Sequence, residues 1–172
     1  MNNERGYTLA ELLTAMAVTG LLLAGLLFTL QEGRDVYQSD AARAEVQQNA
    51  RVALERMLRE LRAATTVTTS AANDVKFTYF SAAGTNDTVE YSLNGGQLQR
   101  NQTGAAGQPE TLIGGVQNLV ITYYDINDVV TTTAANVRTV DIKLTTQPEN
   151  PTVAPQNVRT AIVEGRVRVR NE

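Results

Sequence analysis

Apolar residues are concentrated near the start of the chain, in a stretch without charge that covers residues 12–31. At a rise of about 1.5 Å per residue, a helix of this length is about 30 Å long, which matches the hydrocarbon core of a bilayer. The apolar side chains point to all sides of such a helix, so lipid or other protein must surround it. The pattern therefore predicts a helix that spans a membrane or lies inside an assembly.

The pattern changes after residue 31, where charged residues return and apolar residues recur at spacings of three and four. This spacing predicts an amphipathic helix with one apolar stripe over residues 32–64. We expect it to continue the first helix, so that one helix runs over residues 7–64 and the hydroxyl-rich segment 65–70 ends it. A single apolar stripe needs a sheet to cover it. The stripe consists of Ala42, Val46, Ala50, Leu54, Met57, Leu61 and Ala64.

Residues 65–172 carry the alternation of apolar and polar positions that is typical of strands. Asn94-Gly95-Gly96 predicts a hairpin turn, and Gly165 predicts a bulge. Expected strands cover 75–80, 88–93, 97–100, 116–124, 140–144 and 158–169, with loops at 101–111 and 147–156 and a turn at 125–128. The sequence therefore predicts an α+β fold, in which a long N-terminal helix packs on an antiparallel β-sheet.

Composition argues against several kinds of chemistry. The chain has no cysteine and no histidine, which excludes thiolate zinc sites and removes the commonest general base. Carboxylates form no discernible catalytic pair, so we expect neither an enzyme, nor a cofactor, nor a metal site. Asp125–Asp128 is acidic, but it lacks the length and the terminal glutamate of a calcium loop, so a solvated turn is favoured.

A short basic stripe occupies the last predicted strand, where Arg166, Arg168 and Arg170 alternate on one face. The favoured interpretation is an exposed face that discourages edge pairing between sheets. The alternative is contact with DNA or with an acidic partner. The net charge of −3 makes the chain as a whole a poor binder of polyanions.

Glu11 lies at the edge of the uncharged stretch, where a carboxylate is costly unless it has a partner. Three interpretations compete for this N-terminal segment. A plain membrane anchor explains the hydropathy, and a secretory signal peptide is disfavoured because the apolar run is long and no A-x-A site follows it. The third interpretation depends on the residues before the helix, which read Gly6, Tyr7, Thr8, Leu9, Ala10 and Glu11.

This order of glycine, aromatic residue, Thr-Leu, glutamate and apolar helix resembles the prepilin signal of the type IV pilin and type II secretion pseudopilin superfamily. The resemblance implies that a prepilin peptidase removes a leader peptide, residues 1–6, by cutting between Gly6 and Tyr7. The same enzyme would methylate the new amino terminus at Tyr7. The family usually has phenylalanine there, so tyrosine is a conservative departure.

Cleavage at this position would create an ammonium group on Tyr7, and its partner would be the Glu11 carboxylate of a neighbouring subunit. Within an apolar bundle of helices, a paired carboxylate is much less costly than an unpaired one. We therefore expect the Tyr7–Glu11 pair to set the stagger between subunits. Loss of Glu11 should impair assembly more than folding.

The resemblance extends along the chain. Residues 47–62, Val116–Asp125 and Val167–Asn171 are similar to PilW-type minor pilins and J-type minor pseudopilins. This implies a minor pilin-like subunit of a type IV pilus, at the tip or in an initiation complex. Inner-membrane lipid, the assembly platform and other pilin subunits would be its partners, with the body outside the cytoplasm. A type II secretion pseudopilin and a DNA-uptake pilus subunit are the alternatives.

Overall fold

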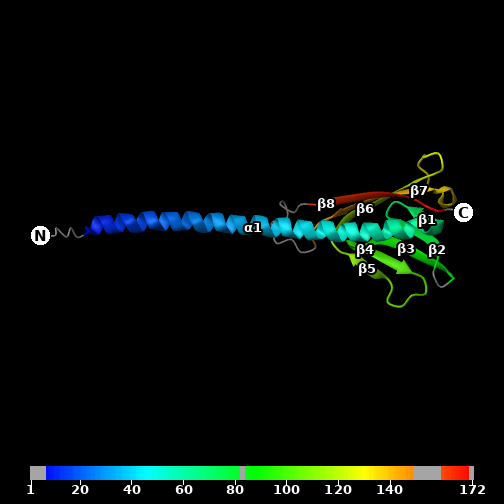
Figure 1. The fold of residues 1–172 in the computed structure, drawn as a ribbon, viewed down its shortest axis with the longest axis horizontal. Helices are drawn as coiled ribbons and strands as arrows, with labels where there is room; N and C mark the ends of the chain where they lie inside the picture. Colours follow the sequence, from blue (N-terminus) through cyan, green and yellow to red (C-terminus); the bar gives the residue numbers. More distant parts are fainter. Residues whose placement is uncertain (1–6, 82–83, 149–159, 171–172) are drawn as a thin grey trace. The chain divides into compact units, whose positions relative to one another are not determined.

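The computed structural model describes residues 7–81, 84–148 and 160–170. Internal contacts divide the chain into two units, Met1–Asp40 and Ala41–Glu172. Helix α1 (Leu9–Arg62) runs through both units, and all of the strands belong to the second (Figure 1). The predicted leader, residues 1–6, lies outside the described residues.

Helix α1 confirms the expectation of one long N-terminal helix, because it is continuous from Leu9 to Arg62. It contains no proline, and leucine and alanine, both strong helix formers, predominate in it. The helix ends on a tight turn in which the Ala63 N–H donates to the Glu60 carbonyl at 3.1 Å. The predicted apolar stripe faces the core from Ala50 onward. Ala50, Leu54, Met57 and Leu61 are buried, and Val46 is half-buried.

The segment expected only to end the helix forms a strand of its own. β1 (Ala64–Ala71) pairs antiparallel with β2 (Asp74–Phe80), with Ala64 and Val67 buried. Threonine and valine favour extended backbone as strongly as they disfavour helix, so one feature of the sequence stops α1 and begins the sheet. The pairing is irregular between Ala64 and Thr66 and again between Val67 and Thr69.

Five strands form the first sheet in the order β1-β2-β3-β4-β5. β3 (Asn86–Asn94) and β4 (Gln97–Gln102) form the predicted hairpin, since Gly95 and Gly96 both have positive φ angles that suit a two-residue turn. The expected loop 101–111 is wrong at both ends, because β4 extends to Gln102 and β5 (Glu110–Ile113) pairs with it. β5 is too short for its alternation to be recognised.

The remaining strands form a second sheet rather than a continuation of the first. β6 (Val116–Tyr124), β7 (Thr139–Thr146) and β8 (Ala161–Arg168) are antiparallel, and the short 3-10 helix η1 (Ala134–Asn136) precedes β7. Gly115, with φ +67°, turns the chain from β5 into the new sheet. β8 is shorter than the predicted strand over 158–169, and residues 158–159 lie outside the described residues.

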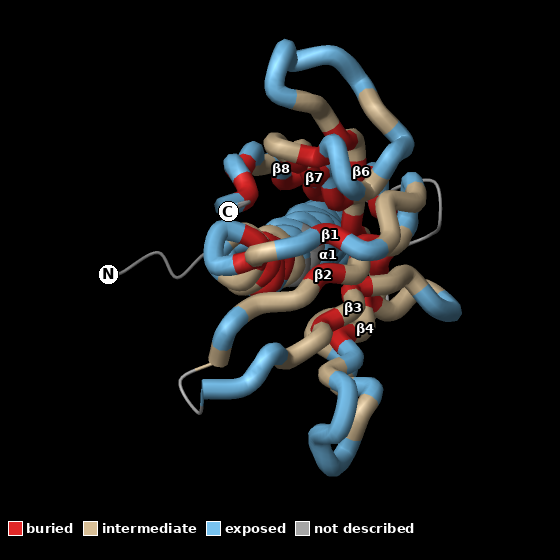
Figure 2. The backbone as a smooth tube through the Cα atoms, turned by 90° about the vertical axis from the view of Figure 1, so that its right-hand side faces the viewer, coloured by how far each residue is buried: buried red, intermediate tan, exposed pale blue. Residues whose placement is uncertain are grey.

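One hydrophobic core joins the second half of α1 to both sheets. Figure 2 shows buried backbone on the helix and on the strands that flank it, with β6, β7 and β8 on one side and β2, β3 and β4 on another. The largest fully buried side chains include Tyr91, Phe77, Met57, Leu61 and Leu98. Tyr91 and Phe77 stack with ring centroids 6.2 Å apart. The sheets thus cover the apolar stripe, as its amphipathic pattern requires.

Gly165 does not form the predicted bulge, because β7 and β8 pair in regular register with Ile142 opposite Gly165. The glycine instead permits close packing of the sheet on the helix. A Cβ atom at this position would lie 2.5 Å from Leu58 Cδ1 and 3.5 Å from Leu54 Cδ2. Tight packing against α1, and not a bulge in the strand, therefore explains the glycine at position 165.

Replacing Gly165 with valine should destabilise the body by about 1–3 kcal/mol, the usual range for overpacking a core. The chain has no tryptophan, so tyrosine fluorescence during urea unfolding would report the transition. Glu164→Val, on the exposed neighbouring position, controls for strand propensity, and Leu58→Ala should recover part of the loss. An equal loss with and without Leu58→Ala would show that this contact is not the cause.

Candidate functional site

The first described residues form a tight cap at the start of α1. Gly6 lies outside the described residues, and Tyr7 is highly exposed. The Thr8 N–H donates to Glu11 Oε2 at 2.9 Å, the Thr8 hydroxyl contacts the same oxygen at 3.0 Å, and the Glu11 N–H donates to Thr8 Oγ1 at 3.3 Å. This reciprocal arrangement is a capping box, which satisfies donors that the first helical turn would otherwise leave free.

The cap gives Glu11 a local structural role, and its predicted role in assembly stays a prediction. Both hydrogen bonds that the Glu11 side chain accepts use Oε2, so Oε1 accepts none from the described part of the chain. A carboxylate has two oxygens and can accept several hydrogen bonds. Glu11 can therefore hold the helix start with one oxygen and receive a cation with the other.

The part of α1 that follows the cap is apolar, and its side chains are exposed. Side chains from Leu12 to Leu30 are exposed on every face, including Leu13, Met16, Leu21, Leu22 and Phe28. By length and composition, α1 is able to cross a membrane. The hydroxyls of Thr14 and Thr29 donate back to carbonyls of their own helix, at 3.0 Å and 2.9 Å, so they suit an apolar environment. This surface needs lipid or protein around it.

A second cluster of charged groups, absent from the sequence predictions, ties α1 to the first sheet. Arg56 donates from Nη1 and Nη2 to the two carboxylate oxygens of Glu110, at 2.9 Å and 3.0 Å. Arg56 also pairs with Glu60, four residues further along the helix, at 3.4 Å. The hydrogen bonds from Arg56 hold the pKa of the Glu110 carboxyl below its usual value. A pair separated by 54 positions leaves no periodic signal in the sequence.

Glu60 is the centre of this cluster. It accepts hydrogen bonds from Arg100 Nε at 3.0 Å and from the Tyr91 hydroxyl at 2.8 Å. Arg100 is only 5% exposed, so Glu60 compensates a buried cation. Burial, followed by the nearby Glu60 carboxylate, raises the pKa of Tyr91, which therefore stays a protonated donor. We interpret the cluster as structural, because it fixes the end of α1 on the sheet.

The predicted basic stripe is only partly available for binding. Arg166 pairs with Asp128, and its guanidinium lies 4.7 Å from the centre of the Tyr124 ring. Arg168 and Arg170 are exposed. Asp125 accepts backbone hydrogen bonds from Asn127 and Val129, as expected for a turn. No cluster of three or more potential metal ligands occurs among the described residues.

Comparisons with known proteins found one similarity in the N-terminal sequence and one in the fold. Residues 1–27 match the family described as the prokaryotic N-terminal methylation motif. The fold is similar to that of a type IV-like pilin from Thermus thermophilus, with a TM-score of 0.54 and 13% sequence identity. That match covers 71% of this chain and 95% of the pilin. No curated protein matches the chain.

These two findings are independent, since one concerns the sequence of the N-terminus and the other the arrangement of helix and sheets. They confirm the pilin-like fold and the resemblance to the superfamily, and they leave the PilW-type assignment untested. The chain thus combines a prokaryotic N-terminal methylation motif over residues 1–27 with a fold similar to that of a type IV-like pilin.

Proposed function

We propose that the chain is a minor pilin-like structural subunit of a type IV pilus, processed after Gly6 and assembled through its N-terminal helix. The observation that carries this proposal is the bare apolar helix with a single carboxylate, Glu11, between Tyr7 and Gln31. Before assembly the helix would sit in the inner membrane, with the body outside the cytoplasm. In the pilus, helices of other subunits would replace the lipid.

The chemistry of the helix start supports the assembly step. Cleavage before Tyr7 would place an ammonium group one residue from the capping box, at the start of a segment in which Glu11 is the one other charge before Glu32. An unpaired charge there is expensive, and the Glu11 carboxylate of a neighbour compensates it. The pair would thus select one stagger between subunits, as we expect for a device that sets register.

Two other functions share parts of this site. A type II secretion pseudopilin would use the same processing and helix packing, and the partners would differ. A DNA-uptake subunit would use the basic stripe on β8, of which Arg166 already pairs with Asp128. Because this pairing reduces the charge available to DNA, we favour the pilus subunit over the DNA-uptake subunit.

A charge-only substitution tests the assembly step. Glu11→Gln keeps an oxygen that can accept the Thr8 N–H, so the capping box persists while the charge is lost. We expect normal cleavage and at least tenfold less protein in the filament fraction, because breaking a buried charge pair costs about 3–5 kcal/mol and ~1.4 kcal/mol corresponds to tenfold. Immunoblots of membrane and filament fractions give both readouts.

Thr8→Val is the matched control, since it removes the hydroxyl of the cap and keeps the carboxylate. Loss of a cap residue costs only about 1 kcal/mol, so incorporation should fall much less. Equal defects in the two variants would show that loss of the charge disturbs assembly no more than loss of the cap does. Wild-type incorporation of Glu11→Gln would show that the charge is incidental.

A further inference from the structure

The second sheet ends in a strand whose outer edge is open. β8 is the last strand of this sheet, and it pairs with β7 over its full length without a register shift. The Val169 N–H donates to the Arg138 carbonyl at 2.9 Å, on the side of β7. Backbone groups of an antiparallel strand alternate between its two edges. The groups that point away from β7 are therefore the N–H and C=O of Ile162, Glu164, Arg166 and Arg168.

These outward groups have no hydrogen-bond partner in the backbone of the described residues. The side chains at the same four positions are exposed on the face of the sheet turned away from the core. A regular row of unpaired N–H and C=O groups is a template on which another extended chain can pair. The edge of β8 therefore has the chemistry for addition of a strand.

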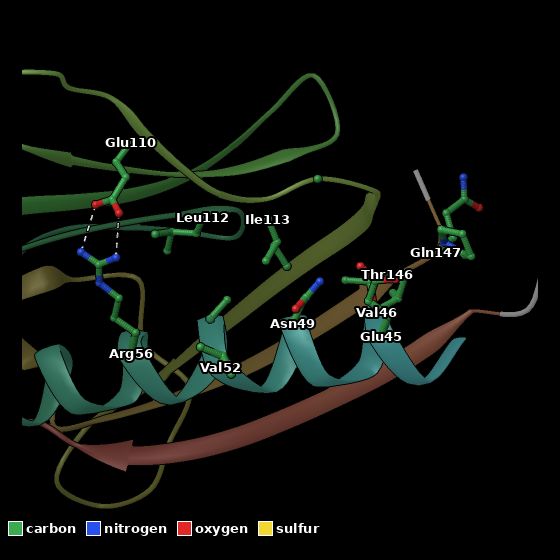
Figure 3. Close-up of a pocket in the computed structure, with 13 residues that line it drawn as sticks. Glu45, Val46, Asn49, Val52, Arg56, Glu110, Leu112, Ile113, Thr146 and Gln147 are labelled. Carbon is green, nitrogen blue, oxygen red and sulfur yellow. Dashed lines mark hydrogen bonds and ion pairs between the residues drawn. The ribbon is translucent and has the colours of Figure 1, made fainter. Parts of the chain in front are cut away.

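The other edges of the two sheets are covered or short. On β6, the Ile121 N–H donates to the Ala72 carbonyl at 2.7 Å, and on β1 the Ser70 hydroxyl donates to the Thr132 carbonyl at 2.8 Å. β5 has only four residues, and the first of them, Glu110, is engaged by α1 beside a hollow (Figure 3). Among the described strands, β8 is thus the long edge that remains open.

Charges around this edge determine which kind of strand it can accept. Arg168 is exposed, and the ion pairs among the described residues do not use it. Leu58 on α1 packs under Gly165 of β8. Arg51 and Arg62, seven residues before and four residues after Leu58, share its side of the helix and are exposed. Three arginines thus border the edge.

A second copy of this chain is a poor occupant of the edge. β8 runs beside the second half of α1 in the same direction (Figures 1 and 3). Two copies joined antiparallel through β8 would hold their helices antiparallel, whereas a shared membrane or filament aligns them. Joining β8 to β5 of another copy would build an open array, which does not suit a minor subunit. In this respect the choice of occupant rests on the proposed function.

We propose that the open edge of β8 receives one extended, acidic segment of a different protein chain, which adds antiparallel as a fourth strand of the second sheet. The segment places an acidic side chain opposite Arg168, a basic one opposite Glu164 and an apolar one opposite Ile162. Further acidic side chains lie toward Arg51 and Arg62. The arginines still discourage pairing with a basic strand, as the sequence predicts, and they favour an acidic one.

A synthetic peptide tests the backbone contact on the purified full-length chain in detergent. The fluorescent peptide Glu-Glu-Thr-Val-Lys-Glu-Val is written from the end that faces Arg168. N-methylation of its third and fifth residues removes N–H groups that point at β8, whereas N-methylation of the second and fourth removes groups that point away. We expect the first pattern to weaken binding at least tenfold and the second by less than about twofold, in anisotropy titrations up to ~1 mM peptide.

Variants of the protein test the same contact from the other side. Glu164→Pro removes an outward N–H that the pairing with β7 does not use, and proline is tolerated at such edge positions. We expect at least tenfold weaker binding, whereas the control Glu164→Ala keeps the N–H and should lose much less. Arg168→Glu should also weaken binding severalfold. A peptide with lysine as its first residue should then restore it.

Several results would overturn the inference. The unmodified peptide might as well be absent if it does not bind, and equal weakening by the two methylation patterns would show a purely electrostatic contact. Unchanged binding to Glu164→Pro and Arg168→Glu would place the peptide elsewhere. Association of copies that Glu164→Pro abolishes would assign the edge to a second copy. These measurements require neither cleavage nor filament assembly, so their failure leaves the proposed function intact, and wild-type incorporation of Glu11→Gln leaves the strand-addition site intact.

Discussion

Substitution of Gly6 by leucine should leave residues 1–6 on the chain, which stays in the membrane fraction and is absent from filaments. The resemblance to prepilins places the cleaved bond directly after Gly6, and a bulky side chain there should obstruct the peptidase. Without cleavage no ammonium forms at Tyr7, so the partner of Glu11 is missing. Mass spectrometry of membrane and filament fractions checks both consequences.

Asn3→Leu is the matched control, because it adds a similar side chain to the leader away from the predicted junction. That variant should be processed and assembled like the unmodified protein. If Gly6→Leu yielded the mature form at normal abundance, the predicted junction would be wrong. If it remained uncleaved yet entered filaments, the charge-pair account of assembly would be wrong.

Glu60→Ala should cause the largest loss of stability in the body. It leaves Arg100 buried without its carboxylate and removes the acceptor of the Tyr91 hydroxyl. Breaking a buried pair in this way costs about 3–5 kcal/mol, a large part of a typical total of about 5–15 kcal/mol. Urea unfolding followed by tyrosine fluorescence measures the change.

Glu55→Ala, five residues earlier on an exposed position of the same helix, should change stability by less than about 0.5 kcal/mol. The double replacement Glu60→Leu with Arg100→Leu should be less harmful than Glu60→Ala, because it leaves no buried charge. A loss below 1 kcal/mol for Glu60→Ala would mean that Arg100 finds another partner or water.

Features set by local sequence were predictable. The uncharged run at residues 12–31 and the stripe from Val46 to Leu61 each determine a helix by their own periodicity. Asn94-Gly95-Gly96 determines its turn because few residues adopt positive φ angles. The capping box was not predicted, although Thr8 and Glu11 have the spacing of three residues that indicates one.

Features that depend on tertiary contact were not predictable. The β-branched and hydroxyl residues of 65–70 are compatible with the end of a helix and with a strand. This segment forms a strand because it pairs with β2. Glu110 pairs with Arg56 only because β5 lies beside α1, and Gly165 is glycine only because Leu58 lies above it. In each case, the partner comes from a distant part of the chain.

The most direct test is the mass and N-terminal sequence of this protein recovered from the filament fraction of cells. We predict a chain that begins at an N-methylated Tyr7 and lacks residues 1–6. A protein that still begins at Met1, or that never occurs in that fraction, would contradict the account.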